Sequence, residues 1–296
     1  MRLAAVDIGT NTVRLLVVDR VGDQLVELHR VATVVGLGVG VDSTGRLGDE
    51  AIDRALRALA VFAPMVAQAH ACRVIATAAS RDAANRESFF DLVEGALGYR
   101  PELISGEEEA GLAFAGAISG RPGGPFLVVD IGGGSTEFVT GQDRVSTAVS
   151  TQIGSVRLTE RASLMPPASP AEVDRARQIV RGVFGSVPKP GFAVAVGVAG
   201  TYTSLSALTQ GLTEYDRSAV HDSILKPDHL THQVDRLATL TVDEIMSLPT
   251  MEPRRAPFIL GGAVVAEMVS KVFAIDRLIV SERDLLDGVV ASLLPQ

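Results

Sequence analysis

A duplicated stretch constrains this chain more than any other feature. The segment Ala5–Thr12, with the sequence AVDIGTNT, returns in altered form as Val128–Thr136, with the sequence VVDIGGGST. Each copy has an apolar run typical of a buried strand, then an aspartate, then a turn of small polar and glycine residues. A second strand-like run follows each turn. The chain is therefore predicted to fold as two related halves that each open with strand, tight turn and strand.

Further strands and helices alternate along both halves, which is typical of an α/β sheet. After each copy we expect a third strand, at 24–35 and 144–151, so that each half begins as a β-meander. Apolar residues at helical spacing run from Ile52 to Val66, and Pro64 is expected to kink or end that helix. The other expected helices lie at 82–97, 107–118, 171–184, 200–209, 228–237, 255–272 and 285–294, and the other expected strands at 73–76, 102–104, 192–196 and 279–280.

The strongest break in the pattern is Arg121–Pro125, because its prolines and glycines cannot continue a helix. We therefore expect domains at 1–122 and 123–296, and leave open that the last helix, about 284–296, packs back on the first domain. With 296 residues, of which 47% are hydrophobic, the chain is long enough for about two domains with conventional cores. This composition excludes a disordered or fibrous chain.

Charge and cysteine content restrict the partners and the compartment. The formal net charge is −8 and no run of Lys or Arg occurs, which argues against a non-specific nucleic-acid binder. Cys72 is the single cysteine, so no intramolecular disulfide can form. Apolar stretches such as Phe192–Ala199 are too short to cross a bilayer, and Asp7 comes too early for a signal peptide. We expect a cytoplasmic protein that binds neither nucleic acid nor membrane.

Both repeated turns have the composition of phosphate-binding loops. Glycines let backbone N–H groups converge on an anion, and hydroxyls add donors without bulk. The aspartate before each turn can hold Mg²⁺ and offset phosphate repulsion. The expected metal ligands are therefore Asp7 and Asp130, and the expected phosphate-binding residues are Gly9, Thr10, Asn11, Thr12, Gly132, Gly133, Gly134 and Ser135. Two matched loops predict a two-sided clamp on one ion and its phosphates.

Other known phosphate motifs do not explain these loops. A Gly-Lys-Ser/Thr element is absent from the sequence, and a Gly-x-Gly-x-x-Gly pattern starting at Gly132 fails at Glu137. A third Gly-rich turn at Gly197–Thr201 precedes a helix whose N-terminus would attract phosphate, which adds Gly200 and Thr201 to the expected phosphate-binding residues. Plain packing by small residues is the alternative explanation of this turn.

Several motifs together resemble one family, that of exopolyphosphatases and guanosine pentaphosphate phosphohydrolases. In chain order they are DIGTNT at 7–12, TAASR at 77–81, ISGEEEA at 104–110, DIGGGSTE at 130–137 and the turn at 197–201. The resemblance covers essentially the whole chain. It implies the fold of the actin, heat-shock chaperone and sugar-kinase superfamily, in which two ribonuclease-H-like domains close an interdomain cleft over phosphate. It also implies Glu109 as the catalytic base, Arg81 as a phosphate-binding arginine and Glu137 as a further metal ligand.

The residues around the acid cluster point to Glu109 independently. Ser105 and Glu108 have the spacing of a capping box, which gives Glu108 a structural task. Glu109 shares a helical face with Leu112 and Gly116 and should turn inward, although acidic residues are also common in the first turn of a helix for dipole reasons. Arg81 follows a strand at its carboxyl end, where α/β sheets place ligands and a guanidinium can bind phosphate oxygens.

We therefore expect a Mg²⁺-dependent exopolyphosphatase that releases terminal phosphate from inorganic polyphosphate. The alternatives are a guanosine pentaphosphate 5′-phosphohydrolase, a kinase of the same superfamily and a non-catalytic sensor of polyphosphate or nucleotide. A homodimer is possible. Longer members of the family carry a further C-terminal helical module, so a preference for shorter polyphosphate is expected for a chain that stops at Gln296.

Overall fold

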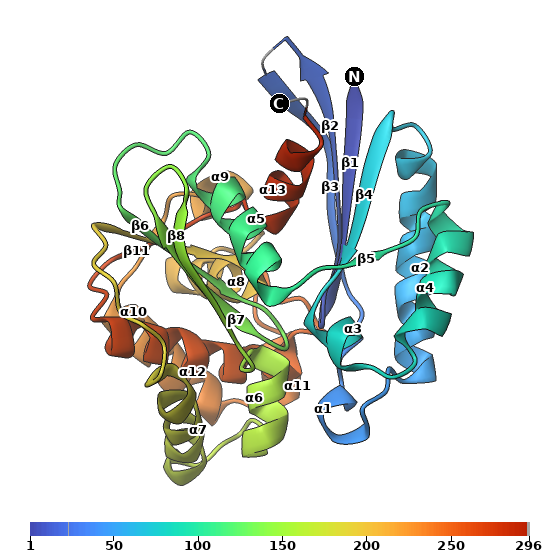
Figure 1. The fold of residues 1–296 in the computed structure, drawn as a ribbon. Helices are drawn as coiled ribbons and strands as arrows, with labels where there is room; N and C mark the ends of the chain where they lie inside the picture. The colour runs from blue at the N-terminus through green and yellow to red at the C-terminus, as the bar shows by residue number, and fades with distance from the viewer. Residues whose placement is uncertain (23, 295–296) are drawn as a thin grey trace. The chain divides into compact units, whose positions relative to one another are not determined.

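The computed structural model describes residues 1–22 and 24–294. Asp23, in the first expected hairpin turn, and the end of the expected last helix region at 295–296 lie outside the described residues. The chain divides into two compact units (Figure 1). Unit 1 comprises Met1–Gly116 and Leu285–Gln296, and unit 2 comprises Ala117–Asp284. The first unit thus ends somewhat before the expected boundary at residue 122.

Unit 1 is built on one sheet with the strand order β3-β2-β1-β4-β5. The strands are β1 (Arg2–Ile8), β2 (Thr12–Val21), β3 (Gln24–Val34), β4 (Ala71–Ala76) and β5 (Glu102–Leu103). The first three strands form an antiparallel meander, as expected, and β1 runs parallel to β4. From Leu3 onward all of β1 is buried, because the sheet is covered on both faces.

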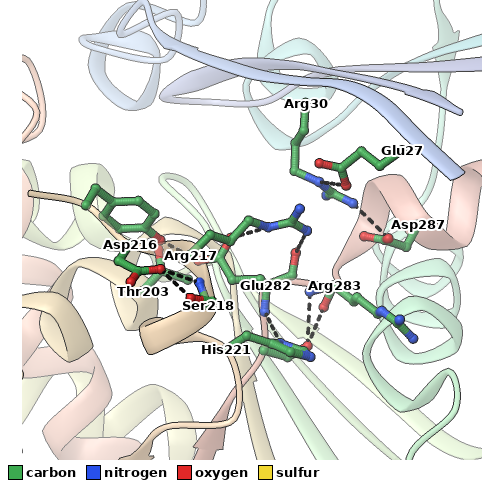
Figure 2. A network of polar contacts seen from close by, with 12 residues as sticks. Glu27, Arg30, Thr203, Asp216, Arg217, Ser218, His221, Glu282, Arg283 and Asp287 are labelled. Carbon is green, nitrogen blue, oxygen red and sulfur yellow. Dashed lines mark hydrogen bonds and ion pairs between the residues drawn. The ribbon is translucent and has the colours of Figure 1, made fainter.

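Helices cover the two faces of this sheet. One face packs against α2 (Asp49–Val66) and α4 (Arg86–Leu97), which meet β1 through the cluster that contains Val6, Leu59 and Phe89. The helix α2 continues for a short stretch beyond Pro64 and ends at Val66. The other face packs against α13 (Leu285–Ser292), which is the last helix of the described chain. Arg30 of β3 donates to Asp287 of α13 over 2.8 Å (Figure 2). Unit 1 also contains the short helices α1 (Val41–Thr44) and α3 (Ala78–Asp82).

Unit 2 repeats this plan in the order β10-β11-β9-β6-β7-β8. Its strands are β6 (Phe126–Ile131), β7 (Thr136–Gly141), β8 (Val145–Thr151), β9 (Val194–Val198), β10 (Ile224–Leu225) and β11 (Leu278–Val280). Here β6, β7 and β8 form the antiparallel meander, and β6 runs parallel to β9. The strands β6 to β9 therefore match β1 to β4, which confirms the duplicated α/β architecture expected from the sequence.

The helices of unit 2 surround a large aliphatic core. They are α6 (Ser155–Ala162), α7 (Pro170–Phe184), α8 (Ala199–Gln210), α9 (Arg217–Val220), α10 (Pro227–Thr239), α11 (Val242–Met246) and α12 (Ala256–Phe273). The helix α5 (Gly106–Ile118) carries the chain from unit 1 into unit 2. The Asp216 side chain caps α9 by accepting from the Ser218 N–H, and Arg217 pairs with Glu282 (Figure 2).

The helix α12 is long and apolar enough to cross a membrane by length and composition alone. The expectation that every apolar stretch is too short for a span therefore fails for this helix. In the structure, 78% of the apolar window of α12 is buried inside the protein, and its residues form part of the core of unit 2. A single buried helix of this kind is weak evidence for a membrane span.

Two local expectations were wrong, and one helix was missed. The segment 82–97 is not one helix, because α3 ends at Asp82 and an extended Ala83 separates it from α4. The strand expected at 192–196 lies at Val194–Val198 instead, so the Gly197 turn is part of a strand that passes directly into α8. No helix was expected at 155–162, where α6 forms.

Candidate active site

The two repeated turns are closed by the same backbone hydrogen bond. In unit 1 the Gly9 N–H donates to the Thr12 carbonyl over 3.0 Å, and in unit 2 the Gly132 N–H donates to the Ser135 carbonyl over the same distance. Each turn joins two antiparallel strands, and each aspartate lies one residue before the end of the first strand. The expected loops are thus equivalent tight connections. Their side chains include the buried Thr10, Asn11 and Ser135.

In unit 1 an arginine lies opposite the loop aspartate. Asp7 pairs in register with Arg14 across the hairpin. The Arg14 guanidinium donates to Asp7 Oδ2 through Nε at 2.8 Å and through Nη2 at 2.7 Å. Asp7 is 1% exposed, so this pair places opposite charges together in a buried position. The expected metal ligand Asp7 is therefore already engaged with a cation of the protein itself.

Glu109 and Arg81 form a second ion pair in unit 1. The Arg81 Nη1 donates to Glu109 Oε2 and to the Ile104 carbonyl, both over 2.9 Å. The Arg81 Nη2 is buried, and no described residue accepts from it. Arg81 is held by α3, directly after β4, and Glu109 by the first turn of α5. The structure thus brings together two residues that were chosen from separate motifs.

The three consecutive glutamates differ as their helix positions predict. Glu109 is 8% exposed, whereas Glu107 and Glu108 lie nearer the surface. The Ser105 hydroxyl accepts from the Glu108 N–H over 3.1 Å, which is half of the expected capping box. The other half was wrong, because the Glu108 carboxylate reaches Arg73 over 2.7 Å instead of folding back on the helix start. Glu108 still has a structural partner, and Glu109 is the glutamate that turns inward.

The surroundings of Glu109 make it a stronger base than an ordinary glutamate. Burial raises the pKa of the Glu109 carboxyl, because the charged form loses hydration. The positive charge of Arg81 opposes this effect, the negative charge of Asp7 reinforces it, and Arg14 opposes it more weakly. Burial prevails, so the pKa lies above its usual range. A general base works best with a pKa near the operating pH, which is the direction of this change.

In unit 2 the residue opposite the loop aspartate is a second acid. Asp130 pairs in register with Glu137, so both side chains leave the same face of the sheet. They are 5% and 1% exposed, and the Ser150 hydroxyl donates to Glu137 Oε1 over 2.7 Å. Two buried carboxylates beside a phosphate loop suit a hard cation such as Mg²⁺, which usually takes one or two carboxylates and completes its shell with water and substrate phosphate.

This donor set is the part of the metal prediction that the geometry fits. Among residues 1–22 and 24–294, no group of three or more His, Cys, Asp or Glu side chains gathers as a complete metal cage. In the hairpin of unit 2, Asp130 and Glu137 are the acidic pair that a cation could bind. In unit 1 both Arg14 contacts go to Asp7 Oδ2, so Arg14 would compete with a cation for that oxygen and not for Asp7 Oδ1.

The third expected phosphate element lies next to the loop of unit 2. The buried Thr201 hydroxyl donates to the Ile131 carbonyl over 3.2 Å, at the end of β6. Gly200 lies against the guanidinium of Arg255, and a Cβ at this glycine would come within 1.9 Å of Arg255 Nη1. The Thr201 hydroxyl therefore joins α8 to the end of β6, directly before the loop at Gly132.

Sequence reasoning missed several residues that hold these loops. Arg14 could have been found, because a strand–turn–strand repeat predicts which residue lies opposite each aspartate. The contacts of Gly38 with loop residue Thr10, and of Gly154 with loop residue Gly133, had no such signal, since they bring together residues from different elements.

Comparison with known proteins shows the family of the chain. The family model described as the Ppx/GppA phosphatase family matches residues 16–296. The chain belongs to this family. It is 44% identical over 314 residues to Exopolyphosphatase 2 of Mycobacterium tuberculosis, covering 99% of this chain and 98% of that protein.

Solved members of the family share the fold. A crystal structure of an exopolyphosphatase-like protein aligns with a TM-score of 0.91 at 38% identity and covers 98% of both chains. The Ppx/GppA family member of Aquifex aeolicus aligns with a TM-score of 0.83 at 32% identity, over 99% of this chain and 97% of that one. The family, the α/β fold and the assignment as a phosphoanhydride hydrolase are thereby confirmed.

Proposed function

We propose that this phosphatase is an exopolyphosphatase that releases terminal phosphate from inorganic polyphosphate in the cytoplasm. The single observation that carries the substrate is the relative named Exopolyphosphatase 2, which is 44% identical and matches 99% of the chain. Unit 1 supports the reaction type, because it holds a buried carboxylate of raised pKa, a guanidinium and one of the two repeated loops, and unit 2 holds the other loop.

In unit 1, Glu109 is the proposed general base and Arg81 the proposed phosphate ligand. A water molecule gives its proton to a Glu109 oxygen while its own oxygen bonds to the terminal phosphorus. The bridging P–O bond then breaks, and the shortened polyphosphate leaves with the electron pair and the negative charge. Arg81 Nη1 orients the Glu109 carboxylate, and its buried Nη2 is available as a donor to a phosphate oxygen.

In unit 2, the loop at Gly132, Gly133, Gly134 and Ser135 is proposed to bind phosphate through backbone N–H groups and the serine hydroxyl. Phosphatases of this family generally depend on a metal ion, and we propose Mg²⁺ held by Asp130 and Glu137. A bound Mg²⁺ would neutralise charge on the phosphate oxygens. Asp7 stays a proposed metal ligand; its Oδ2 accepts from Arg14, and its negative charge also helps to raise the pKa of Glu109.

A phosphate-release assay on three substrates tests this proposal. Polyphosphate, guanosine pentaphosphate and ATP are offered at equal concentration, with Mg²⁺ and then with excess chelator. We expect the highest kcat/KM on polyphosphate and loss of release with the chelator. A clear preference for guanosine pentaphosphate would replace the proposed substrate, and phosphate transfer from ATP to a sugar or carboxylate would identify a kinase.

A further inference from the structure

Residues 35–38, which directly follow β3, form hydrogen bonds to the loop at 9–12 in unit 1. The N–H groups of Val35 and Gly36 both donate to the Asn11 carbonyl, over 2.8 and 3.0 Å. The N–H group of Gly38 donates to the Thr10 carbonyl over 2.7 Å. The two carbonyls in the middle of the loop are therefore bonded to the exit of the third strand.

The segment after β8 makes a related set of contacts in unit 2, but to the first and second loop residues instead of the second and third. The Ser155 N–H donates to the Gly132 carbonyl over 2.9 Å, and the N–H groups of Val156 and Arg157 donate to the Gly133 carbonyl over 2.9 and 3.1 Å. These donors are the first N–H groups of α6, which have no partner within their own helix. The duplication thus extends beyond the hairpins to the segments that back them.

This arrangement fixes the direction of the loop N–H groups. In a planar trans peptide the carbonyl and the following N–H point in opposite directions. When Gly38 binds the Thr10 carbonyl, the Asn11 N–H faces away from that contact. In unit 2, the bonded carbonyls of Gly132 and Gly133 turn the N–H groups of Gly133 and Gly134 the other way. A loop that binds an anion needs its N–H groups to point toward the anion and its carbonyl groups to point away from it, because a carbonyl oxygen would repel phosphate.

In each unit, one glycine in the segment after the third strand lets that segment approach the loop closely, because it has no side chain. A Cβ at Gly38 would lie 2.3 Å from Thr10 Cγ2 and 3.2 Å from the Ala79 Cβ. A Cβ at Gly154 would lie 2.6 Å from the Gly133 carbonyl carbon and oxygen. Gly154 has an extended backbone with φ −147, which any residue adopts, so what it supplies is space. A larger residue at either position must push the loop or its threonine out of place.

We infer that Gly38 and Gly154 are positioning residues, each of which holds the loop of its own unit with its N–H groups turned toward substrate phosphate. Neither glycine touches the substrate. Each acts through the peptide groups of its loop, by allowing the strand exit to approach. The inference rests on the proposed function for the identity of the substrate, but the loop geometry applies to any phosphate chain.

The test compares Gly38→Ala and Gly154→Ala with Gly48→Ala and Gly182→Ala. A Cβ at either control glycine would meet no atom within 4 Å, and neither control has a left-handed backbone, so these substitutions change composition without a collision. Kinetics on polyphosphate and the rise in Tm on adding tripolyphosphate are measured for each. A displacement near 1 Å can cost about 100-fold in rate, so we expect kcat/KM to fall about 10- to 100-fold in the first two variants, mainly through KM.

A rescue separates a positioning role from a general loss of stability. The atom nearest to the new Cβ of Gly38→Ala is Thr10 Cγ2, and Thr10→Ser removes it while keeping the hydroxyl. The double variant should recover most of the lost kcat/KM and the tripolyphosphate shift. Because this comparison does not involve Gly154, it still tests the inference if the Gly154→Ala variant does not fold. Unchanged KM and Tm shift in Gly38→Ala, or no recovery in the double variant, would overturn the inference.

The two proposals fail in different ways. If the wild-type protein releases no phosphate from polyphosphate but is stabilised by tripolyphosphate, the proposed function fails and the loop comparison still stands. If the wild-type protein hydrolyses polyphosphate and Gly38→Ala does so equally well, only the role of Gly38 fails. If tripolyphosphate stabilises neither protein and no hydrolysis occurs, both are wrong.

Discussion

Replacing Glu109 by glutamine tests the chemistry of the site most directly. The Glu109→Gln variant keeps the shape of the side chain and an oxygen that can accept from Arg81 Nη1, which also retains the Ile104 carbonyl as a partner. It removes the ability to take a proton. We therefore expect the geometry of the Arg81 contact to survive and the proton-transfer step to fail.

The size of the effect follows from the role of a base. General base catalysis typically contributes about 10²- to 10⁴-fold in rate, equivalent to roughly 2.7–5.5 kcal/mol in the barrier. Because burial raises the pKa of Glu109 above its usual range, its carboxylate is a better base than an exposed one, which favours the upper part of that interval. KM should change little, since Arg81 and the loops remain.

Glu108→Gln is the matched control, because it changes the neighbouring side chain to the same amide. Glu108 is exposed and pairs with Arg73, so its loss should cost at most about 1 kcal/mol in stability and leave kcat unchanged. Phosphate release is measured under saturating substrate, together with Tm for both variants. A kcat of Glu109→Gln equal to that of Glu108→Gln would remove Glu109 from the mechanism and refute the reasoning.

Two further predictions follow from the ionisation of buried groups. Activity of the wild-type protein should rise with pH as Glu109 loses its proton. In a pH profile of kcat/KM, the midpoint of this rise should lie above the ordinary pKa of a glutamate. A midpoint at or below that value would contradict the burial effect. Glu267 is buried, which opposes its ionisation, but hydrogen bonds from Arg177 and Lys271 outweigh burial and hold its pKa below the usual range. The ion pairs therefore stabilise the fold at pH values above the pKa of Glu267 in the unfolded chain. This stabilisation is lost as pH falls through the pKa of Glu267 in the folded protein. Glu267→Gln should lower stability at neutral pH by about 1–3 kcal/mol, with a Tm difference that shrinks in acid and kcat unchanged; a constant Tm difference would argue against the ion pairs.

The sequence was sufficient for features that repeat at short range. The hairpins at Asp7 and Asp130 were predictable because apolar runs, a turn and a second strand occur within a few residues of each other. Strand pairing then follows from the hairpin itself, and both meanders form as expected. The inward direction of Glu109 was predictable for the same reason, since the spacing along a helix determines which residues share a face.

Contacts between distant elements could not be predicted. Glu108 leaves its own helix start for Arg73, a residue of β4, because a guanidinium is a stronger partner than a backbone N–H. The helix α6 was missed because much of its burial comes from packing on α12, where Gly261 lets the backbone of Ser155 approach closely. A pattern within one segment contains no information about a partner that lies far away along the chain.

The two loops show how a duplicated framework can take different chemical roles. The hairpins have the same closing hydrogen bond and the same aspartate, and in each loop the carbonyl of the second residue accepts from the segment that follows the third strand. The position opposite the aspartate differs in sign, because Arg14 occupies it in unit 1 and Glu137 in unit 2. The arginine neutralises its aspartate and lowers the need for a cation, whereas the second acid increases that need. The two hairpins therefore share a backbone arrangement and differ in charge opposite the aspartate, a difference that is consistent with the metal site proposed in unit 2.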